Sequence, residues 1–394
     1  MALADRGGSV VTLYDVARLA GVSTATVSRV VHGQDRVREA TRAKVQRVIE
    51  QLGYVPDSAA QSLSRRRKDV IGLVTIEREV KQYDIENMGL LYYDEILRGV
   101  QTRIRDDHRW SLLIATLYEE EERDYPRLIS LTGKVDGLLI GEGIIPGALL
   151  ARLTERIPVV IIAGDPGKTD VVKADNHSGA TALFTHLVEE HGCRRFFHVD
   201  GPANVPDARE RRFALGQVLE SHPQCGLIGS YRGILSVQSG EDAANALLIS
   251  HGEALPDAIV CVNDQMAMGV LQAFAKAGVR VPEDVAVTGF DDIYPFSLND
   301  SPLSTVHQPM RLLGERACDR LLDRIARPNL RRRVELLPTE LVLRSSCGCP
   351  PGVMTRRPVL KVKAAPSPGR PAANGQAHGN PSSPAGRPGW AATS

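Results

Sequence analysis

The chain contains 394 residues, of which 43% are hydrophobic, and its 48 basic and 47 acidic side chains nearly cancel. This length is too great for one small hydrophobic core, so we expect a multidomain protein and exclude a single small module. The sequence has no apolar N-terminal stretch typical of a secretion signal and no run of about 18 apolar residues that could cross a membrane. We therefore expect a cytoplasmic protein with no membrane partner.

Charge is unevenly distributed along the chain. Residues 1–70 hold 12 Lys and Arg against 7 Asp and Glu, and residues 350–394 hold 6 basic side chains and no acidic one. The segment between them is acidic, with 30 basic and 40 acidic residues. A basic N-terminal part is typical of a surface that contacts phosphates, although the same imbalance is common in unrelated proteins.

The first predicted elements are two short helices joined by a glycine turn. Thr12 and Asp15 have the spacing of a capping box that opens a helix, and Gly21 ends that helix. Ser23 can cap a second helix over residues 24–31, whose valines face inward. The outward side chains of this second helix would then meet base edges in a DNA groove. An ordinary helical hairpin with a solvated polar face is the alternative.

A third amphipathic helix is predicted to complete a small core. Val45, Val48, Ile49 and Leu52 recur at helical spacing, and Gly53 ends the pattern. Three short helices around one core make a headpiece. A polar linker follows over residues 57–69 and ends in a basic cluster. It is too short to hold a helix by itself, because one or two turns do not offset the cost of nucleation.

The body alternates short apolar runs with helical patterns. The runs that are typical of buried strands cover residues 70–76, 112–115, 135–140, 159–162, 196–199, 259–262 and 285–288, and helical patterns include residues 95–105, 180–190, 210–220 and 264–277. Apolar strands separated by helices indicate an α/β fold with parallel sheets covered on both faces. So many strands need two sheets, and we expect a small molecule to bind between the two α/β halves.

Enzyme and metal signals are weak. The sequence contains no P-loop, no Gly-x-Ser-x-Gly elbow and no His-Glu-x-x-His motif, so we expect no enzyme and no cofactor. Cys347 and Cys349 suggest a metal or redox pair, but two thiols without nearby histidines would be a poor zinc site. His191, Cys193 and His198 suggest another cluster, yet they fall across a helix end and a strand. We therefore predict no metal.

The C-terminal segment differs from the body in composition. Residues 350–394 contain 9 prolines among 45 residues, with scattered Gly, Ala, Ser and Arg. Such a segment cannot bury a core, so we expect a disordered basic tail. The tail could add non-specific affinity for DNA, or it could be an extension without a function.

Several fragments near the N-terminus occur in a characteristic order and spacing. They are Thr12-Leu13-Tyr14-Asp15-Val16-Ala17, Gly21-Val22-Ser23, Thr26-Val27-Ser28-Arg29-Val30-Val31, Leu52-Gly53-Tyr54-Val55-Pro56 and Ala60-Gln61-Ser62-Leu63. Through them, and through matches that continue to about Cys349, the chain resembles the lactose-repressor (LacI/GalR) family of bacterial transcription regulators. The resemblance implies a helix-turn-helix headpiece over residues 1–56, a hinge helix and linker over 57–69, and a two-lobed periplasmic-binding-protein-like effector and dimerisation domain over 70–349.

The resemblance also implies which side chains contact DNA. The implied major-groove residues are Tyr14, Thr24, Ala25, Ser28, Arg29 and His32, the implied phosphate contacts are Ser23, Thr26 and Thr41, and Leu63 takes the place of a leucine that wedges into the minor groove. Arg29 is the strongest candidate, because a planar guanidinium can grip guanine O6 and N7. Leu63 could instead be a linker leucine that packs on the body.

An effector site is implied in the same way. The residues that match effector contacts are Tyr92, Tyr93, Arg211, Asn263, Asp291 and Gln308. A guanidinium, amides and a carboxylate can donate and accept hydrogen bonds to a polyhydroxylated ligand. Asp291 and Asn263 could instead cap strand ends or pack between the lobes, and Arg211 could equally be a surface charge. Leu235 stands where relatives often carry an aromatic residue that stacks on a sugar. A carbohydrate is therefore the default effector of the family, and these residues do not establish it.

Together these expectations describe an effector-responsive regulator, most simply a repressor. Its partners would be operator double-stranded DNA, a small-molecule effector that is a sugar or sugar derivative, and a second copy of the chain, as a homodimer or a tetramer. It would act at the nucleoid. A solute-binding receptor and an architectural DNA-binding protein are the alternatives from other classes.

Overall fold

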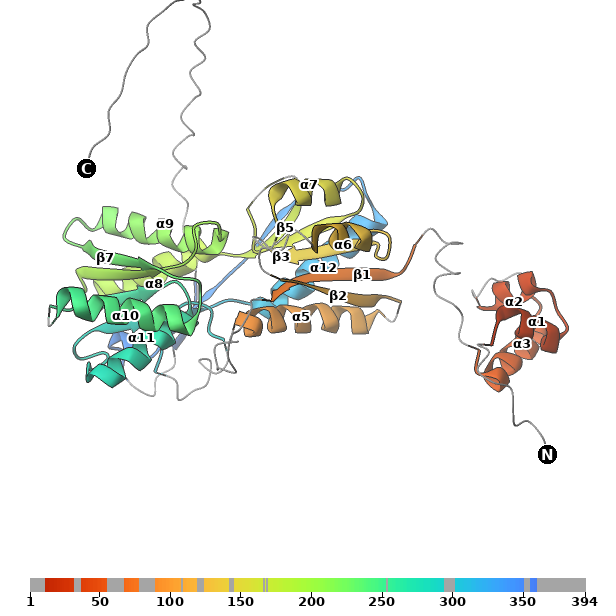
Figure 1. Cartoon of the computed structure of the whole chain (residues 1–394), viewed down its shortest axis with the longest axis horizontal. Coiled ribbons are helices and arrows are strands. Elements are labelled where there is room, and N and C mark those ends of the chain that lie inside the picture. The colour runs from red at the N-terminus through yellow and green to blue at the C-terminus, as the bar shows by residue number, and fades with distance from the viewer. Residues whose placement is uncertain are drawn as a thin grey trace, which may run out of the picture. The chain divides into compact units, whose positions relative to one another are not determined.

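The computed structural model describes residues 11–31, 37–54, 67–77, 89–107, 109–118, 124–141, 145–165, 167, 169–252, 254–293, 302–350 and 355–359. They form a three-helix headpiece and a larger α/β body (Figure 1). Within these ranges, no helix combines the length and the apolar character needed to cross a membrane.

The headpiece contains the three predicted helices: α1 (Leu13–Ala20), α2 (Thr24–Val31) and α3 (Glu39–Leu52). The Asp15 carboxylate accepts hydrogen bonds from the Thr12 backbone N–H at 3.0 Å and from its hydroxyl at 2.7 Å, so the predicted start of α1 is confirmed. Gly21 and Gly53 end α1 and α3 with φ of 62° and 60°, the left-handed conformation that favours glycine. The buried headpiece core consists of Val16, Ala17, Ala20, Val27, Val30, Val45, Val48 and Tyr54.

The first lobe of the body, here called the N-lobe, is a six-stranded parallel sheet in the order β11-β5-β4-β3-β1-β2. Its strands are β1 (Val70–Glu77), β2 (Ser111–Tyr118), β3 (Gly137–Gly141), β4 (Val159–Ile162), β5 (Asp170–Ala174) and β11 (Val334–Leu337). Its helices are α5 (Gly89–Asp106), α6 (Asp124–Leu131), α7 (Gly147–Thr154) and α12 (Met310–Ala326).

Helices cover both faces of the N-lobe sheet. α6 and α7 pack on one face, and α5 and α12 lie together on the other (Figure 1). α5 and α12 approach closely through two glycines. A Cβ at Gly99 would lie 1.9 Å from the Arg311 carbonyl oxygen, and one at Gly314 would lie 2.1 Å from that of Ile96. Only glycine therefore fits at these two positions.

The second lobe, here called the C-lobe, is a four-stranded parallel sheet in the order β7-β6-β8-β9. Its strands are β6 (Arg195–Asp200), β7 (Gly226–Arg232), β8 (Ala258–Cys261) and β9 (Ala286–Thr288), and its helices are α8 (Asn176–Glu189), α9 (Pro206–Ser221), α10 (Val237–His251) and α11 (Asp264–Ala277). α8 and α9 pack on one face, while α10 and α11 pack on the other. The predicted α/β class with parallel sheets is confirmed.

A third, antiparallel sheet was not predicted. It contains β10 (Thr305–His307), β12 (Glu340–Leu343) and β13 (Thr355–Pro358), in that order, and it packs against α8. β13 corrects the expectation of a disordered tail from residue 350. Residues 355–358 pair with β12, the Val359 side chain packs on the C-lobe core, and the Val359 N–H donates to the Thr339 carbonyl at 3.1 Å. The open edge of β12 offers backbone groups that pair with residues 355–358. Composition alone does not predict such pairing.

Candidate functional site

The described residues among those predicted to contact DNA reach the headpiece surface to different degrees. Tyr14 is 75% exposed, and Ala25 and Arg29 of α2 are exposed as well. Thr24, Thr26, Ser28 and Thr41 are half-buried. His32 and Leu63 lie outside the described residues.

Ser23 fixes the start of α2. Its hydroxyl oxygen accepts a hydrogen bond from the Thr26 backbone N–H at 3.2 Å and lies 2.9 Å from the Thr26 hydroxyl. The predicted cap is confirmed. The first turn of a helix leaves backbone N–H groups free to bind an anion, and the α2 start carries hydroxyls beside them. A surface of this kind can contact a phosphate while Arg29, farther along α2, reaches a base edge.

In the body, Arg211 lies at the centre of a buried polar cluster. Its side chain, on α9, is only 5% exposed, so it is not a surface charge. Nε donates to Asn176 Oδ1 at 2.9 Å, and Nη1 donates to the Val262 carbonyl at 2.5 Å. Nη1 also lies 3.3 Å from Asp291 Oδ1, and Nη2 lies 3.8 Å from Asp207 Oδ2. The guanidinium thus has one carboxylate on each side.

The same cluster includes two buried polar atoms that lack hydrogen-bond partners within the described part of the chain. They are the Tyr92 hydroxyl and the Gln308 Oε1 atom. The other end of the Gln308 amide donates to Asp291 Oδ1 at 2.5 Å. An unpaired buried polar group costs about 1–3 kcal/mol, so a polar ligand that hydrogen-bonds to these atoms would remove that cost.

Burial controls the charge state of the cluster. It raises the pKa of Asp207 to about 6, against the lowering effect of Arg211. Burial also raises the pKa of Asp291, again opposed by Arg211, and raises that of the Tyr92 hydroxyl, with a further contribution from Asp207. Asp291 has a φ of 124°, an unfavourable value for a residue with a side chain, and such strain is frequent at ligand sites.

The structure brings together four of the six residues predicted to contact the effector: Tyr92, Arg211, Asp291 and Gln308. Tyr93 stacks edge-on against Tyr92, with 5.4 Å between ring centroids. Asn263 makes hydrogen bonds within the chain, and its predicted contact with the effector stays a prediction. Its side chain caps α11 by accepting from the Met266 N–H at 3.0 Å, and it donates to Gln265 and to the Leu235 carbonyl.

Three further members of the cluster were missed among the predicted site residues. Asn176 donates to Asp207 Oδ1 at 2.9 Å, and the Arg211 guanidinium lies 3.8 Å from the Phe290 ring centroid. Asp207 and Arg211 are four positions apart, which places them on one side of a helix. That spacing was a usable signal for Asp207. Asn176 is the first residue of α8, and only the tertiary packing of α8 against α9 brings its side chain to Arg211.

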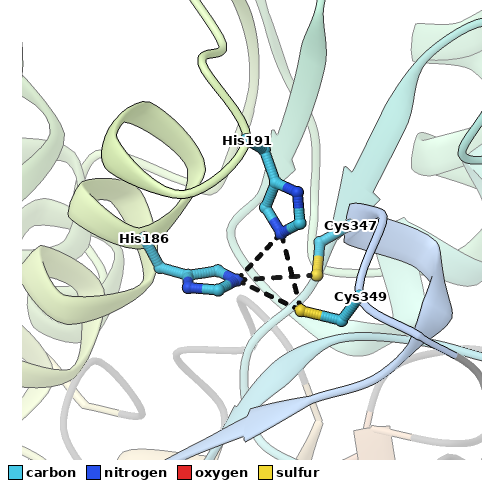
Figure 2. A group of neighbouring side chains, drawn as sticks. All are labelled: His186, His191, Cys347 and Cys349. Carbon is cyan, nitrogen blue, oxygen red and sulfur yellow. Dashed lines mark hydrogen bonds between the residues drawn. The ribbon is translucent and has the colours of Figure 1, made fainter.

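The structure also corrects the expectation about Cys347 and Cys349. The prediction assumed that no histidine lies near these thiols. His186 and His191 lie beside them, and one ligand atom from each of the four residues falls within 4.8 Å of the others (Figure 2). The two histidines are about 160 positions away in the sequence, so spacing along the chain could not reveal them.

Two family models match the chain. Residues 12–57 match "Bacterial regulatory proteins, lacI family", and residues 184–347 match "Periplasmic binding protein-like domain". The chain is similar to the ribose operon repressor of Escherichia coli, with 34% identity over 335 residues, 83% of this chain and 97% of that protein. It is 31% identical to the HTH-type transcriptional repressor PurR of Photobacterium profundum, over 85% of this chain and 98% of that protein.

Solved structures agree with this relationship. The Lac repressor dimer bound to operator and the anti-inducer ONPF matches with a TM-score of 0.75 and 28% identity, over 86% of this chain and 99% of that one. The complex of the transcriptional regulator CelR with cellobiose matches with a TM-score of 0.61 and 30% identity, over 85% and 99%. The chain therefore belongs to the lacI family of bacterial regulatory proteins and is a DNA-binding transcriptional regulator with an effector-binding domain.

Proposed function

We propose that the chain is a repressor that binds a near-palindromic operator as a homodimer and releases it when a sugar occupies the Arg211 cluster. The observation that carries this proposal is the buried cluster itself. It contains a guanidinium, two carboxylates and two amides, and two of its polar atoms have no hydrogen-bond partner in the described part of the chain. The protein would act in the cytoplasm on nucleoid DNA, and no catalytic role is proposed.

On the DNA side, α2 would enter the major groove. Arg29 would read a guanine, Ala25 would contact a base edge, and Ser23 with Thr26 would bind a phosphate at the start of the helix. In a homodimer, two such helices would read two half-sites related by a twofold axis. The roles of His32 at the groove and of Leu63 as a minor-groove wedge stay predictions from the family resemblance.

On the effector side, the chemistry of the cluster favours a polyol. The Asp207 and Asp291 carboxylates can accept hydrogen bonds from hydroxyls, while Arg211 and Gln308 can donate. The names of the relatives support the same class, because they include a ribose operon repressor and a regulator bound to cellobiose. A pentose is the first candidate, and a purine base, suggested by the name PurR, is the second.

The two sites would be coupled through one equilibrium. A ligand that favours a lobe arrangement incompatible with DNA binding lowers operator affinity, and DNA then lowers ligand affinity by the same factor. A corepressor would reverse the sign.

The test is a titration of the full chain on labelled operator DNA, measured by fluorescence anisotropy. D-ribose, cellobiose and a set of purine bases are added in turn. We expect a sugar to raise the apparent Kd of the operator about 5–150-fold, the usual range of allosteric coupling. In a Gln308→Leu variant this response should disappear while operator binding without ligand persists. A purine base that tightens binding would replace induction with corepression, and no response to any ligand would refute the effector half of the proposal.

A truncated chain separates the alternatives from other classes. A protein lacking residues 1–64 should keep ligand binding and lose operator binding. If the truncated chain kept operator binding, the headpiece would not be the DNA-binding part. If full-length protein bound a sugar but never DNA, the receptor alternative would be favoured.

A further inference from the structure

Four potential metal ligands meet where the end of α8 contacts the segment after β12. His186 lies in the last turn of α8, and His191 lies just beyond that helix. Cys347 ends a short 3-10 helix (Ser345–Cys347), and Cys349 follows after one glycine. In Figure 2 the two imidazole rings and the two sulfur atoms point toward a common centre. These residues belong neither to the headpiece nor to the Arg211 cluster.

The distances match a tetrahedron around one metal ion. His186 Nε2 lies 3.0 Å from His191 Nε2, 3.4 Å from Cys349 Sγ and 3.9 Å from Cys347 Sγ, and Cys349 Sγ lies 3.5 Å from His191 Nε2. Zinc takes nitrogen at about 2.0–2.1 Å and sulfur at about 2.3 Å, so ligand atoms around tetrahedral zinc are separated by roughly 3.3–3.8 Å. These four separations lie close to the zinc values, and all six separations among the ligand atoms are within 4.8 Å.

The local backbone is shaped for this arrangement. Gly348, between the two cysteines, has a φ of 101°, a conformation that other residues rarely adopt. A Cβ at Gly348 would lie 3.1 Å from His191 Nδ1, so a side chain there would press against the imidazole. The His-x₄-His spacing also lies within the range of known zinc sites. Glycine thus lets both cysteine sulfurs face the histidines at close range.

The surroundings fit a structural site. Cys347 is 2% exposed, and the other three residues are half-buried, so the centre is shielded without being inaccessible. The Ser304 hydroxyl lies 3.1 Å from Cys347 Sγ, where it can donate to the sulfur once the thiol proton has left. Such a contact around a metal ligand orients it and tunes its basicity.

We propose that His186, His191, Cys347 and Cys349 form a structural Zn²⁺ site that ties the end of α8 to the C-terminal end of the C-lobe. A complete Cys₂His₂ set leaves no open position, so the ion would stabilise the fold and not catalyse a reaction. Binding releases the two thiol protons to solvent. Cys349 lies six residues before β13 begins at Thr355, so the ion would also anchor the chain close to that strand.

The experiment uses the full chain, stripped with a chelator under reducing conditions and then titrated with Co²⁺ and Zn²⁺. We expect one Co²⁺ per chain, with the visible bands of a tetrahedral site and the near-ultraviolet band of a thiolate–cobalt bond, both removed by one equivalent of Zn²⁺. Free Zn²⁺ at 100 times its Kd should raise Tm by about 5–10 °C.

Variants decide between this site and adventitious binding. Cys347→Ser with Cys349→Ser should abolish the cobalt spectrum and the Tm response, while a control with Cys225→Ser and His222→Gln in the same lobe should keep both. If the double cysteine variant fails to fold, His191→Gln alone should weaken Co²⁺ binding and change its spectrum. An unchanged spectrum in the cysteine and His191 variants, or no tetrahedral cobalt in the wild type, would overturn the proposal. A Cys347–Cys349 disulfide that persists under reducing conditions would overturn it as well.

Discussion

The headpiece and the Arg211 cluster place function in opposite environments. In the headpiece, the residues that we assign to DNA recognition lie outside a small apolar core, with Tyr14 75% exposed and Arg29 exposed. In the body, the residues assigned to the effector are buried, and Arg211 is 5% exposed between two carboxylates. We therefore expect substitutions of the DNA-recognition residues to leave the stability of the headpiece unchanged. Substitutions in the Arg211 cluster should lower the stability of the body as well as its ligand binding.

Arg211 gives the largest expected effect on the body. Arg211→Met leaves Asp207 and Asp291 buried without their cation, and breaking a buried pair in this way costs about 3–5 kcal/mol. We expect the free energy of unfolding of the body to fall by that amount and ligand binding to be lost. Arg209→Met, on the exposed side of the same helix, is the matched control and should change stability by less than about 1 kcal/mol. Equal effects in chemical denaturation would show that burial does not distinguish the two arginines.

Arg29 tests the opposite behaviour. Arg29→Ala should cost about 1–3 kcal/mol of operator discrimination per half-site while the headpiece keeps its stability. Arg47→Ala removes the same charge from the exposed side of α3 and should weaken binding to all sequences equally, as loss of a phosphate contact would. Anisotropy titrations on operator and scrambled duplex separate these outcomes. If only Arg47→Ala lost discrimination between operator and scrambled duplex, the assignment of base recognition to α2 would be contradicted.

His198 makes the stability of the body depend on pH. Burial lowers the pKa of this imidazole to about 4, with Asp200 opposing the shift, whereas the unfolded chain has a value near 6.5. Its contribution to stability is therefore complete above about pH 6.5 and is lost as the pH falls toward 4. Between pH 7 and pH 5 the body should lose about 2 kcal/mol from this residue. His198→Gln should reduce the pH slope, measured by urea unfolding, and an unchanged slope would contradict the assignment.

The smallest expected effect is at a helix end of the headpiece. Gly53 has a φ of 60°, and a Cβ there would meet open space. Gly53→Ala should therefore cost about 1 kcal/mol of headpiece stability through backbone strain alone. The expected result is a lower headpiece transition in calorimetry, an unchanged body transition and unchanged discrimination between operators. Loss of ligand binding in this variant would show that the two regions are not separable.

The sequence predicted the parts of the fold that depend on local patterns. The capping box at Thr12 and the glycine ends at Gly21 and Gly53 identified the headpiece helices, and apolar runs identified β1 to β4, β6, β8 and β9. β5 was missed because this fully buried strand includes Asp170 and Lys173 and does not read as an apolar run. β7 and β13 were missed because they carry few buried residues and their existence depends on a neighbour with an open edge. The same reason explains the wrong boundary at residue 350.

Sites assembled from distant parts of the chain were predicted only in part. Resemblance placed Arg211, Asp291 and Gln308 together, but Asn176 joins them from another helix without a local signal. Cys347 and Cys349 were visible as a pair, while their histidine neighbours come from the end of α8. Both sites depend on tertiary contacts between elements that the sequence does not relate to each other.

The binding of the full chain to duplexes selected from a random DNA pool tests whether α2 reads DNA. We expect selected duplexes to contain two related half-sites, to bind with a Kd of about 10 nM or tighter at physiological salt, and to lose most of that affinity with Arg29→Ala. Failure to enrich any sequence, with no duplex bound at micromolar protein in low salt, would contradict the claim that α2 reads DNA.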